Sequence, residues 1–316
     1  MKIKRSISYL VPSSQAGRTI REYLLDKGYS SRNIIQLKEH QDAFLVNGAP
    51  RFTNYPLWAD DKLTVRIYED AAHGNNTVEK IEPVELPLSI LYEDEDFLVV
   101  NKPAGMPIHP SMNNYGNTLA NALAFYYQEK KERFVFRCVN RLDKDTSGLT
   151  IIAKHIVSAG ILSSMVSDHS LQREYRAVVR GRLTPEIGMI KAPIGRKPGS
   201  VIERCIDWEH GEQAITHYCT LAFDAGYSLL AIRLATGRTH QIRVHMQSLG
   251  HPLAGDFLYA PGNSDPIERQ ALHSCYLEFS HPMTGVPMRF KEPLPADMVS
   301  LTEKMTLSKS SIRYFP

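Results

Sequence analysis

The sequence predicts an α+β protein in which a small helix-helix-β module precedes a β-rich domain with a mixed, mainly antiparallel sheet. Three observations predict this class. The 316 residues suffice for two domains of ordinary size. Two helix-like runs and a hairpin signal fall within the first 68 residues. Short runs rich in Val, Ile, Phe and Tyr dominate from residue 86 onward. With 43% hydrophobic and 22% charged residues, the composition argues against collagen, coiled coil and wholesale disorder.

Two predicted helices open the chain. In residues 18–28 apolar side chains recur at helical spacing, and Gly28 stands where a helix would end. Ser30 and Ser31 are candidate N-caps for a second helical run. The first module is therefore expected to begin with a helix pair.

A hairpin is predicted next, because Asn47-Gly48 follows the apolar residues 44–46 and residues 63–67 alternate as a closing strand. Residues 69–85 have no apolar periodicity and are rich in acidic, Gly and Asn residues, so they are expected to be a linker. The predicted domains are thus 1–68 and 86–316, joined by the acidic linker 69–85.

The second domain is expected to be built mainly from strands. Helical patterns are fewer, at 118–127 and 156–167. Short apolar runs bounded by turn residues predict strands at 89–91, 97–100, 134–139, 149–153, 175–179, 229–235 and 276–279.

Charge is segregated along the chain. Residues 1–67 carry a net +5, residues 68–100 carry −8 and residues 101–316 carry +6, within a total of only +3. Two basic blocks flanking an acidic strip permit nucleic-acid binding through phosphate neutralisation, although solvated charged faces produce the same pattern.

The four cysteines are widely spaced, with no Cys-x-x-Cys pair to bind zinc or exchange disulfides. They are interpreted as core residues in a reducing compartment. The apolar stretch after the basic N-terminus is broken too early for a signal peptide, and no run of 18 apolar residues predicts a membrane span. The expected location is the cytoplasm.

One connection between predicted strands contains two carboxylates, two hydroxyls and a glycine: Asp143, Asp145, Thr146, Ser147 and Gly148. Such residues are common in tight turns, because their side chains bond neighbouring backbone groups and Gly permits positive φ. The two aspartates also suggest a glycosidase pair, but a turn leaves their separation unknown. On spacing alone a structural role is favoured.

The remaining motifs change this interpretation, because six of them, in order across residues 86–295, resemble the RluA-type pseudouridine synthase family. They are Asn101-Lys102-Pro103-Ala104-Gly105 with His109-Pro110; Arg141-Leu142-Asp143 with Thr146-Ser147-Gly148; Tyr175 within Arg-Glu-Tyr-Arg-Ala; Thr236-Gly237-Arg238-Thr239-His240-Gln241-Ile242-Arg243-Val244-His245; Gly250-His251-Pro252 with Gly255-Asp256; and Ala271-Leu272-His273 with His281-Pro282. The first module, with Ser31-Arg32 and Val46-Asn47-Gly48, resembles the alpha-L RNA-binding fold.

The family resemblance implies a reaction in which a uridine in RNA is detached at its glycosidic bond, turned over and rejoined through carbon 5, without cofactor or metal. Asp143 matches the catalytic aspartate, acting either on ribose C1′ as nucleophile or on the C2′ proton as base, and the sequence leaves both routes open. Arg243 matches the cation that keeps this carboxylate ionised, an interaction of about 4 kcal/mol at about 4 Å and an effective dielectric near 20. Tyr175 matches the tyrosine that packs against the target base.

Further residues are expected to contact RNA. Arg141 matches the residue that enters the space left by the extruded uridine. Lys102, Arg238 and His240 lie in family motifs; Lys102 is alternatively a solvated side chain and His240 a core histidine. No metal site is expected, since His240 and His245 have no partners at ligand spacing. In the first module, Arg32 and Lys38 lie on the outer side of the second predicted helix.

The expected partner is RNA: large-subunit ribosomal RNA by family analogy, with transfer RNA as the alternative. The protein is expected to be a monomer. A catalytically inactive RNA-binding or ribosome-assembly factor is the rival hypothesis, favoured only by Asn140 in place of the family His. A glycosidase that releases free uracil is a third. Arg173 replaces a common Lys, and residues 211–216 lack the Lys usual in the family.

Overall fold

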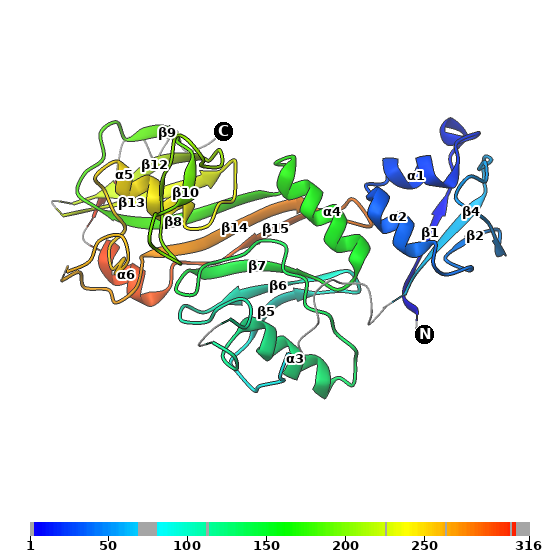
Figure 1. Cartoon of the computed structure of the whole chain (residues 1–316), viewed down its shortest axis with the longest axis horizontal. Helices are drawn as coiled ribbons and strands as arrows, with labels where there is room; N and C mark the ends of the chain where they lie inside the picture. Colours follow the sequence, from blue (N-terminus) through cyan, green and yellow to red (C-terminus); the bar gives the residue numbers. More distant parts are fainter. Residues whose placement is uncertain are drawn as a thin grey trace.

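The protein is described by a computed structural model covering residues 3–68, 81–111, 114–224, 226–262, 264–303 and 305–307. It contains a small N-terminal sheet and a large central sheet, with helices beside each (Figure 1). Every helix among these residues is too short or too polar to traverse a lipid bilayer. The predicted α+β class, with a mixed sheet, is confirmed.

The N-terminal sheet has the strand order β1-β4-β2-β3. Its elements are β1 (Ile3–Leu10), the 3-10 turn η1 (Ser13–Gln15), α1 (Ile20–Asp26), α2 (Ser31–Leu37), β2 (Phe44–Val46), β3 (Ala49–Pro50) and β4 (Lys62–Tyr68). Gly28 has φ +85° just after α1, and the side chain of Ser30 caps α2 by accepting a bond from Asn33 N. Asn47 and Gly48 both have positive φ in the β2–β3 turn.

Strand β1 was not expected from the sequence. It pairs antiparallel with β4, so the module is a four-stranded sheet with two helices rather than a helix pair followed by a ribbon. Only Ile7 of this strand is fully buried. The strand therefore lacks a continuous apolar face and depends on β4 for its pairing.

The large sheet has ten strands, eight of them in the order β16-β12-β13-β8-β14-β7-β6-β5, with β15 paired to β14 and β9 to β12. The β14–β7 pair is parallel and the other pairs are antiparallel. The strands are β5 (Ser89–Glu93), β6 (Phe97–Lys102), β7 (Ser147–Ala153), β8 (Gln172–Arg180), β9 (Ile187–Lys191), β12 (Ile215–Phe223), β13 (Tyr227–Leu234), β14 (Leu272–Ser280), β15 (Pro287–Lys291) and β16 (Thr306–Leu307). Strands β10 (Ile194–Arg196) and β11 (Arg204–Ile206) form a separate hairpin.

The helices of this part are α3 (Leu119–Glu129), α4 (Ile156–Ser167), α5 (Gln241–Ser248) and α6 (Ala296–Thr302). The first two confirm the helical patterns at 118–127 and 156–167. The strand predicted at 134–139 is wrong. The rings of Phe134 and Phe136 pack into the apolar cluster beside α3, and Phe134 stacks on Tyr127. Only the end of the segment pairs with β7, through one antiparallel bridge between Cys138 and Ile152, so no regular strand forms.

The predicted domain boundaries stay a proposal. Residues 69–80 of the predicted acidic linker lie outside the described residues. Residues 81–85 run beside α3, where the carbonyl of Glu82 accepts a bond from Asn121 Nδ2 at 2.7 Å.

The N-terminal module contacts the rest of the protein at α4, which lies beside α2 (Figure 1). Val157 and Ile161 of α4 belong to the same apolar cluster as the core of the module. Asn33 Nδ2 donates to the carbonyl of Ile156 at 3.1 Å. A Cβ at Gly160 would lie 2.4 Å from Asn33 Oδ1, so this glycine permits the close approach.

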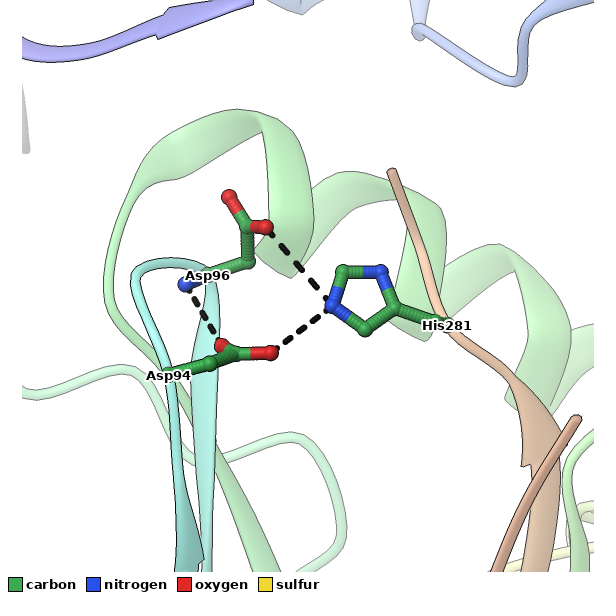
Figure 2. Close-up of side chains that lie close together, drawn as sticks. All are labelled: Asp94, Asp96 and His281. Atoms are coloured by element: carbon green, nitrogen blue, oxygen red, sulfur yellow. Dashed lines mark hydrogen bonds and ion pairs between the residues drawn. The ribbon is translucent and has the colours of Figure 1, made fainter. Parts of the chain in front are cut away.

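A polar cluster completes this joint (Figure 2). Asp96 accepts from Arg5 Nε of β1 at 3.0 Å and from His155 Nε2 at 2.9 Å. Asp94 accepts from His281 Nε2 at 2.7 Å and from the backbone N of Asp96 at 2.7 Å. Asp94, Asp96 and His281 are close enough to hold a metal ion, but hydrogen-bond donors, one of them a guanidinium, already engage both carboxylates. The cluster is therefore interpreted as a hydrogen-bonded link between β1 and the central sheet.

Candidate active site

Asp143 lies in the connection that leads into β7. The turn is closed by a bond from Thr146 N to the Asp143 carbonyl at 3.1 Å. Before it, the buried Asn140 side chain donates to the Leu149 carbonyl at 3.2 Å and accepts from Ile151 N at 2.8 Å. Asn140 thus links the start of the connection to β7, which follows it. Although Asn140 stands where the family usually has His, its side chain still holds the connection by hydrogen bonds.

Lys102, the last residue of β6, bonds to the same connection. Its ammonium donates to the carbonyls of Pro103 at 2.8 Å, Met106 at 2.8 Å and Lys144 at 2.9 Å. The side chain is 0% exposed, and burial lowers the pKa of Lys102 to about 7. The expected contact between Lys102 and RNA is therefore wrong, because the cation is enclosed and its donors bond backbone oxygens.

Arg243, on α5, links two carboxylates. Its Nη1 lies 3.3 Å from Asp143 Oδ2, while its Nε and Nη2 donate to the two oxygens of Asp256 at 2.7 and 2.8 Å. The Asp256 side chain is 0% exposed and that of Asp143 is 26% exposed. Asp256 is thus the tight bidentate partner, and Asp143 is held by one longer contact with its carboxylate accessible to a ligand.

The charge of Arg243 is secured by these pairs. Burial disfavours the guanidinium, but the bonds and charge of Asp256 and the charge of Asp143 outweigh it and raise the pKa of Arg243. The ring of Tyr259 lies 4.9 Å from the guanidinium carbon, which adds a cation–π contact. The cation next to Asp143 is therefore permanent.

His240 lies on the other side of Asp143. It precedes α5 in the left-handed conformation, with φ 58°. Its Nδ1 is 2.8 Å from the Tyr259 hydroxyl, and its Nε2 is 3.9 Å from Asp143 Oδ2. Burial lowers the pKa of His240, which favours a neutral imidazole. His245, in contrast, is buried between Thr216 and the Ala192 carbonyl and serves the core.

Tyr175 projects from β8 into the same place. It lines a cavity of about 580 Å³ together with Asp143, Arg141 and Arg238. A smaller pocket of about 50 Å³ adjoins it and is lined by Asp143, Tyr175 and Arg243. Burial raises the pKa of the Tyr175 hydroxyl, so the group stays protonated near neutral pH. The larger cavity falls within the range of small-ligand sites.

The predicted RNA-contacting residues are divided between two places. Arg141 and Arg238 line the cavity, where Arg238 also pairs with Glu212. His240 lies within the smaller pocket. Arg32 and Lys38 are exposed on and just after α2, outside this cavity.

Two residues of the site were missed by sequence reasoning. Asp256 lies in the Gly255-Asp256 motif, and Tyr259 follows three residues later. The available signal for Asp256 was the Gly-Asp pair itself, and the structure shows Gly255 in a turn with φ +71°. Nothing in the local sequence pointed to Tyr259.

Comparison with known proteins gives a consistent result. A family model described as RNA pseudouridylate synthase matches residues 96–248. An uncharacterized RNA pseudouridine synthase of Bacillus subtilis, YjbO, is 41% identical over 283 residues, covering 90% of this chain and 98% of the relative. Ribosomal large subunit pseudouridine synthase D of Nitrosomonas europaea is 34% identical over 319 residues, covering 98% and 91%.

A solved structure agrees. Human RNA Pseudouridylate Synthase Domain Containing 1 matches with a TM-score of 0.57 at 27% identity, covering 73% of this chain and 96% of that one. Sequence, fold and relatives together show that the chain belongs to the RluA-type RNA pseudouridine synthases.

Proposed function

We propose that this RNA pseudouridine synthase acts on uridine in large-subunit ribosomal RNA, with Asp143 as the reacting carboxylate, Arg243 as its counter-ion and Tyr175 against the base. The observation that carries the proposal is the contact of 3.3 Å between Asp143 and Arg243 beside a cavity of about 580 Å³. An ionised carboxylate next to such a cavity suits attack on C1′ or removal of the C2′ proton, and both routes stay open.

The geometry favours isomerisation over hydrolysis. A glycosidase needs a second carboxyl group free to protonate the leaving base or activate water. The second carboxylate of this site, Asp256, has both oxygens bonded by Arg243, and Oδ1 also accepts from the backbone N of Leu258 and Tyr259 at 3.1 Å. Asp256 is therefore a poor acid or base, so the detached base is expected to be retained and rejoined.

Ribosomal RNA is proposed as the substrate because several relatives at 34–41% identity are named ribosomal large subunit pseudouridine synthase D. The exposed cations Arg32 and Lys38 on the N-terminal module support binding of a structured RNA outside the cavity. Transfer RNA is the alternative. We place the enzyme in the cytoplasm, in keeping with four free thiols, and expect a monomer.

Tritium release from uridine-5-tritiated RNA tests the function. The wild-type protein should release tritium from large-subunit RNA and not from transfer RNA. Asp143→Asn should abolish release and leave RNA affinity within about twofold, because the substitution removes the reacting charge but keeps the shape. Asp145→Asn, in the same turn, is the matched control and should retain activity.

The outcomes separate the alternatives. RNA binding by the wild type without tritium release would support an inactive binding or assembly factor. Free uracil among the products would indicate a glycosidase. Normal turnover by Asp143→Asn would refute the role of Asp143. Mapping modified uridines in a deletion strain would identify the substrate position.

A further inference from the structure

Arg173 is a further cation on the wall of the catalytic cavity, beside Arg141 and Arg238. It lies on β8, two residues before Tyr175, so the two side chains share a face of the strand about 7 Å apart. Both line the cavity of about 580 Å³ that contains Asp143. Arg173 is 9% exposed, which makes it a buried charge rather than a solvated one.

This guanidinium has no partner among the described residues. Its buried Nε–H donates to none of them, and none of them forms an ion pair with Arg173. Other buried or half-buried arginines differ: Arg243 has Asp256, and Arg176, on the opposite face of β8, has Glu174. A largely buried cation without a counter-charge is unfavourable in a fold, so its position on the wall of a cavity points to an anionic ligand.

The surroundings of Arg173 leave it facing the cavity. A Cβ at Gly237 would lie 3.5 Å from Arg173 Nη1, so the guanidinium rests against the backbone of the β13–α5 connection. The other titratable side chains that line the cavity are Arg141, Arg238, His169, Tyr175 and Asp143. Asp143 is the single acid among them and is engaged by Arg243. The cavity thus has an excess of positive charge.

We propose that Arg173 binds a phosphodiester oxygen of the RNA, at a phosphate flanking the target uridine. The inference rests on the proposed function, in which Asp143 faces the ribose and Tyr175 the base. The phosphate is the part of the nucleotide left for Arg173, and it is the only part with a negative charge to neutralise a buried guanidinium. A guanidinium fork matches two phosphate oxygens, whereas a uracil carbonyl supplies no charge.

The first test compares Arg173→Met with Arg176→Met on large-subunit RNA. Loss of a charged hydrogen bond should raise KM and the dissociation constant about 10- to 100-fold for Arg173→Met, with kcat nearly unchanged. The dependence of log affinity on log salt should become shallower by about one phosphate contact. Arg173→Lys should recover part of the affinity. Arg176→Met, on the same strand but the opposite face, should bind as the wild type does.

Stability without RNA provides an independent readout. Removing an unpaired buried charge should leave the melting temperature of Arg173→Met equal to or above that of the wild type. A purely structural arginine would instead give a lower melting temperature. Lower stability with unchanged RNA affinity would overturn the proposal.

The second test identifies the phosphate. Synthetic stem-loops carrying the mapped uridine are made with a neutral methylphosphonate on its 5′ or its 3′ side. One of the two should weaken wild-type binding about 10- to 100-fold and weaken Arg173→Met no further. Equal sensitivity of both proteins at both positions would refute the contact. Failure of the proposed function is distinguishable, because it would appear as absent tritium release with the wild type, whereas the dissociation constants of the wild type, Arg173→Met and Arg176→Met for large-subunit RNA can be compared without turnover.

Discussion

Arg243 binds two carboxylates unequally, and this asymmetry gives each a different task. Asp256 is fully enclosed and takes two short bonds, whereas Asp143 has one bond of 3.3 Å and is partly open. A bidentate buried pair fixes the position of the guanidinium. The accessible carboxylate can then react while its counter-ion stays in place.

Substitution of Asp256 should reduce the free energy of unfolding strongly, whereas substitution of Asp143 should leave it nearly unchanged. Asp256→Asn leaves Arg243 buried without its main counter-charge, so the free energy of unfolding should fall by about 3 kcal/mol or more. Tritium release should also fall at least about tenfold, because Arg243 loses its fixed position. Asp143→Asn should change stability by about 1 kcal/mol or less, since its pair is longer and partly exposed. Urea denaturation of both variants measures this; equal losses would contradict the division of tasks.

The sequence identified one of these acids and not the other. Asp143, Arg243 and Tyr175 were predicted through motifs, and the structure brings all three to one pocket. Asp256 was visible within a motif, but a buried structural acid and a surface turn acid look alike in sequence. Only burial and the bidentate contact distinguish them. Lys102 was misread for the same reason, because a motif does not reveal which side of a loop a long side chain takes.

Among the elements, the connection before β7 depends on the buried ammonium of Lys102. This ammonium donates to three backbone carbonyls, and one of them is the carbonyl of Lys144, next to Asp143. Lys102→Met should lower kcat about 10- to 100-fold through loss of loop position, since a displacement of about 1 Å has effects of this size. Lys144→Met is the matched control, because its side chain is exposed and its carbonyl is retained.

The pH dependence of stability tests the burial of Lys102. Burial lowers the pKa of Lys102 to about 7, whereas an unfolded lysine titrates near 10.5. Between these values the unfolded chain binds more protons than the folded one, so stability should rise with pH. The wild type should therefore gain unfolding free energy relative to Lys102→Met between about pH 7 and 10, by a few kcal/mol on the order of the shift. Parallel pH profiles of the two proteins in urea denaturation would refute this.

Element prediction succeeded where local signals were complete. The helices α1 to α4 carry N-cap side chains and apolar spacing that the sequence displays. Strand β1 was missed because its partner β4 lies about 60 residues away in sequence and its apolar face is interrupted. Residues 134–139 were misassigned because aromatic residues that pack against a helix have the same composition as a strand.

For the whole molecule, the joint at α4 fixes the N-terminal module against the central sheet. Arg5 bonds Asp96, and Asn33 bonds the Ile156 carbonyl, across separations of about 90 and 120 residues. Contacts of this range leave no local pattern in a sequence. They were therefore not predicted, although both segments were assigned.

Arg5→Glu tests this joint. A fourth acid beside Asp94, Glu95 and Asp96 should repel β1 and separate the module from α4, so the radius of gyration in X-ray scattering should increase. RNA affinity should fall more than in Arg21→Glu, which makes the same charge change at an exposed site on α1. Identical scattering and equal affinity for the two variants would show that the joint does not hold in solution.

Val157 and Ile161 complete the hydrophobic interior of the first module, so α4 contributes to the folding of both parts of the chain. Deleting the N-terminal module would expose these two side chains and leave an apolar patch on α4 in contact with water. A catalytic part expressed alone should therefore need polar substitutions at these two positions to stay soluble. In the intact enzyme, the two parts should unfold in a single thermal transition.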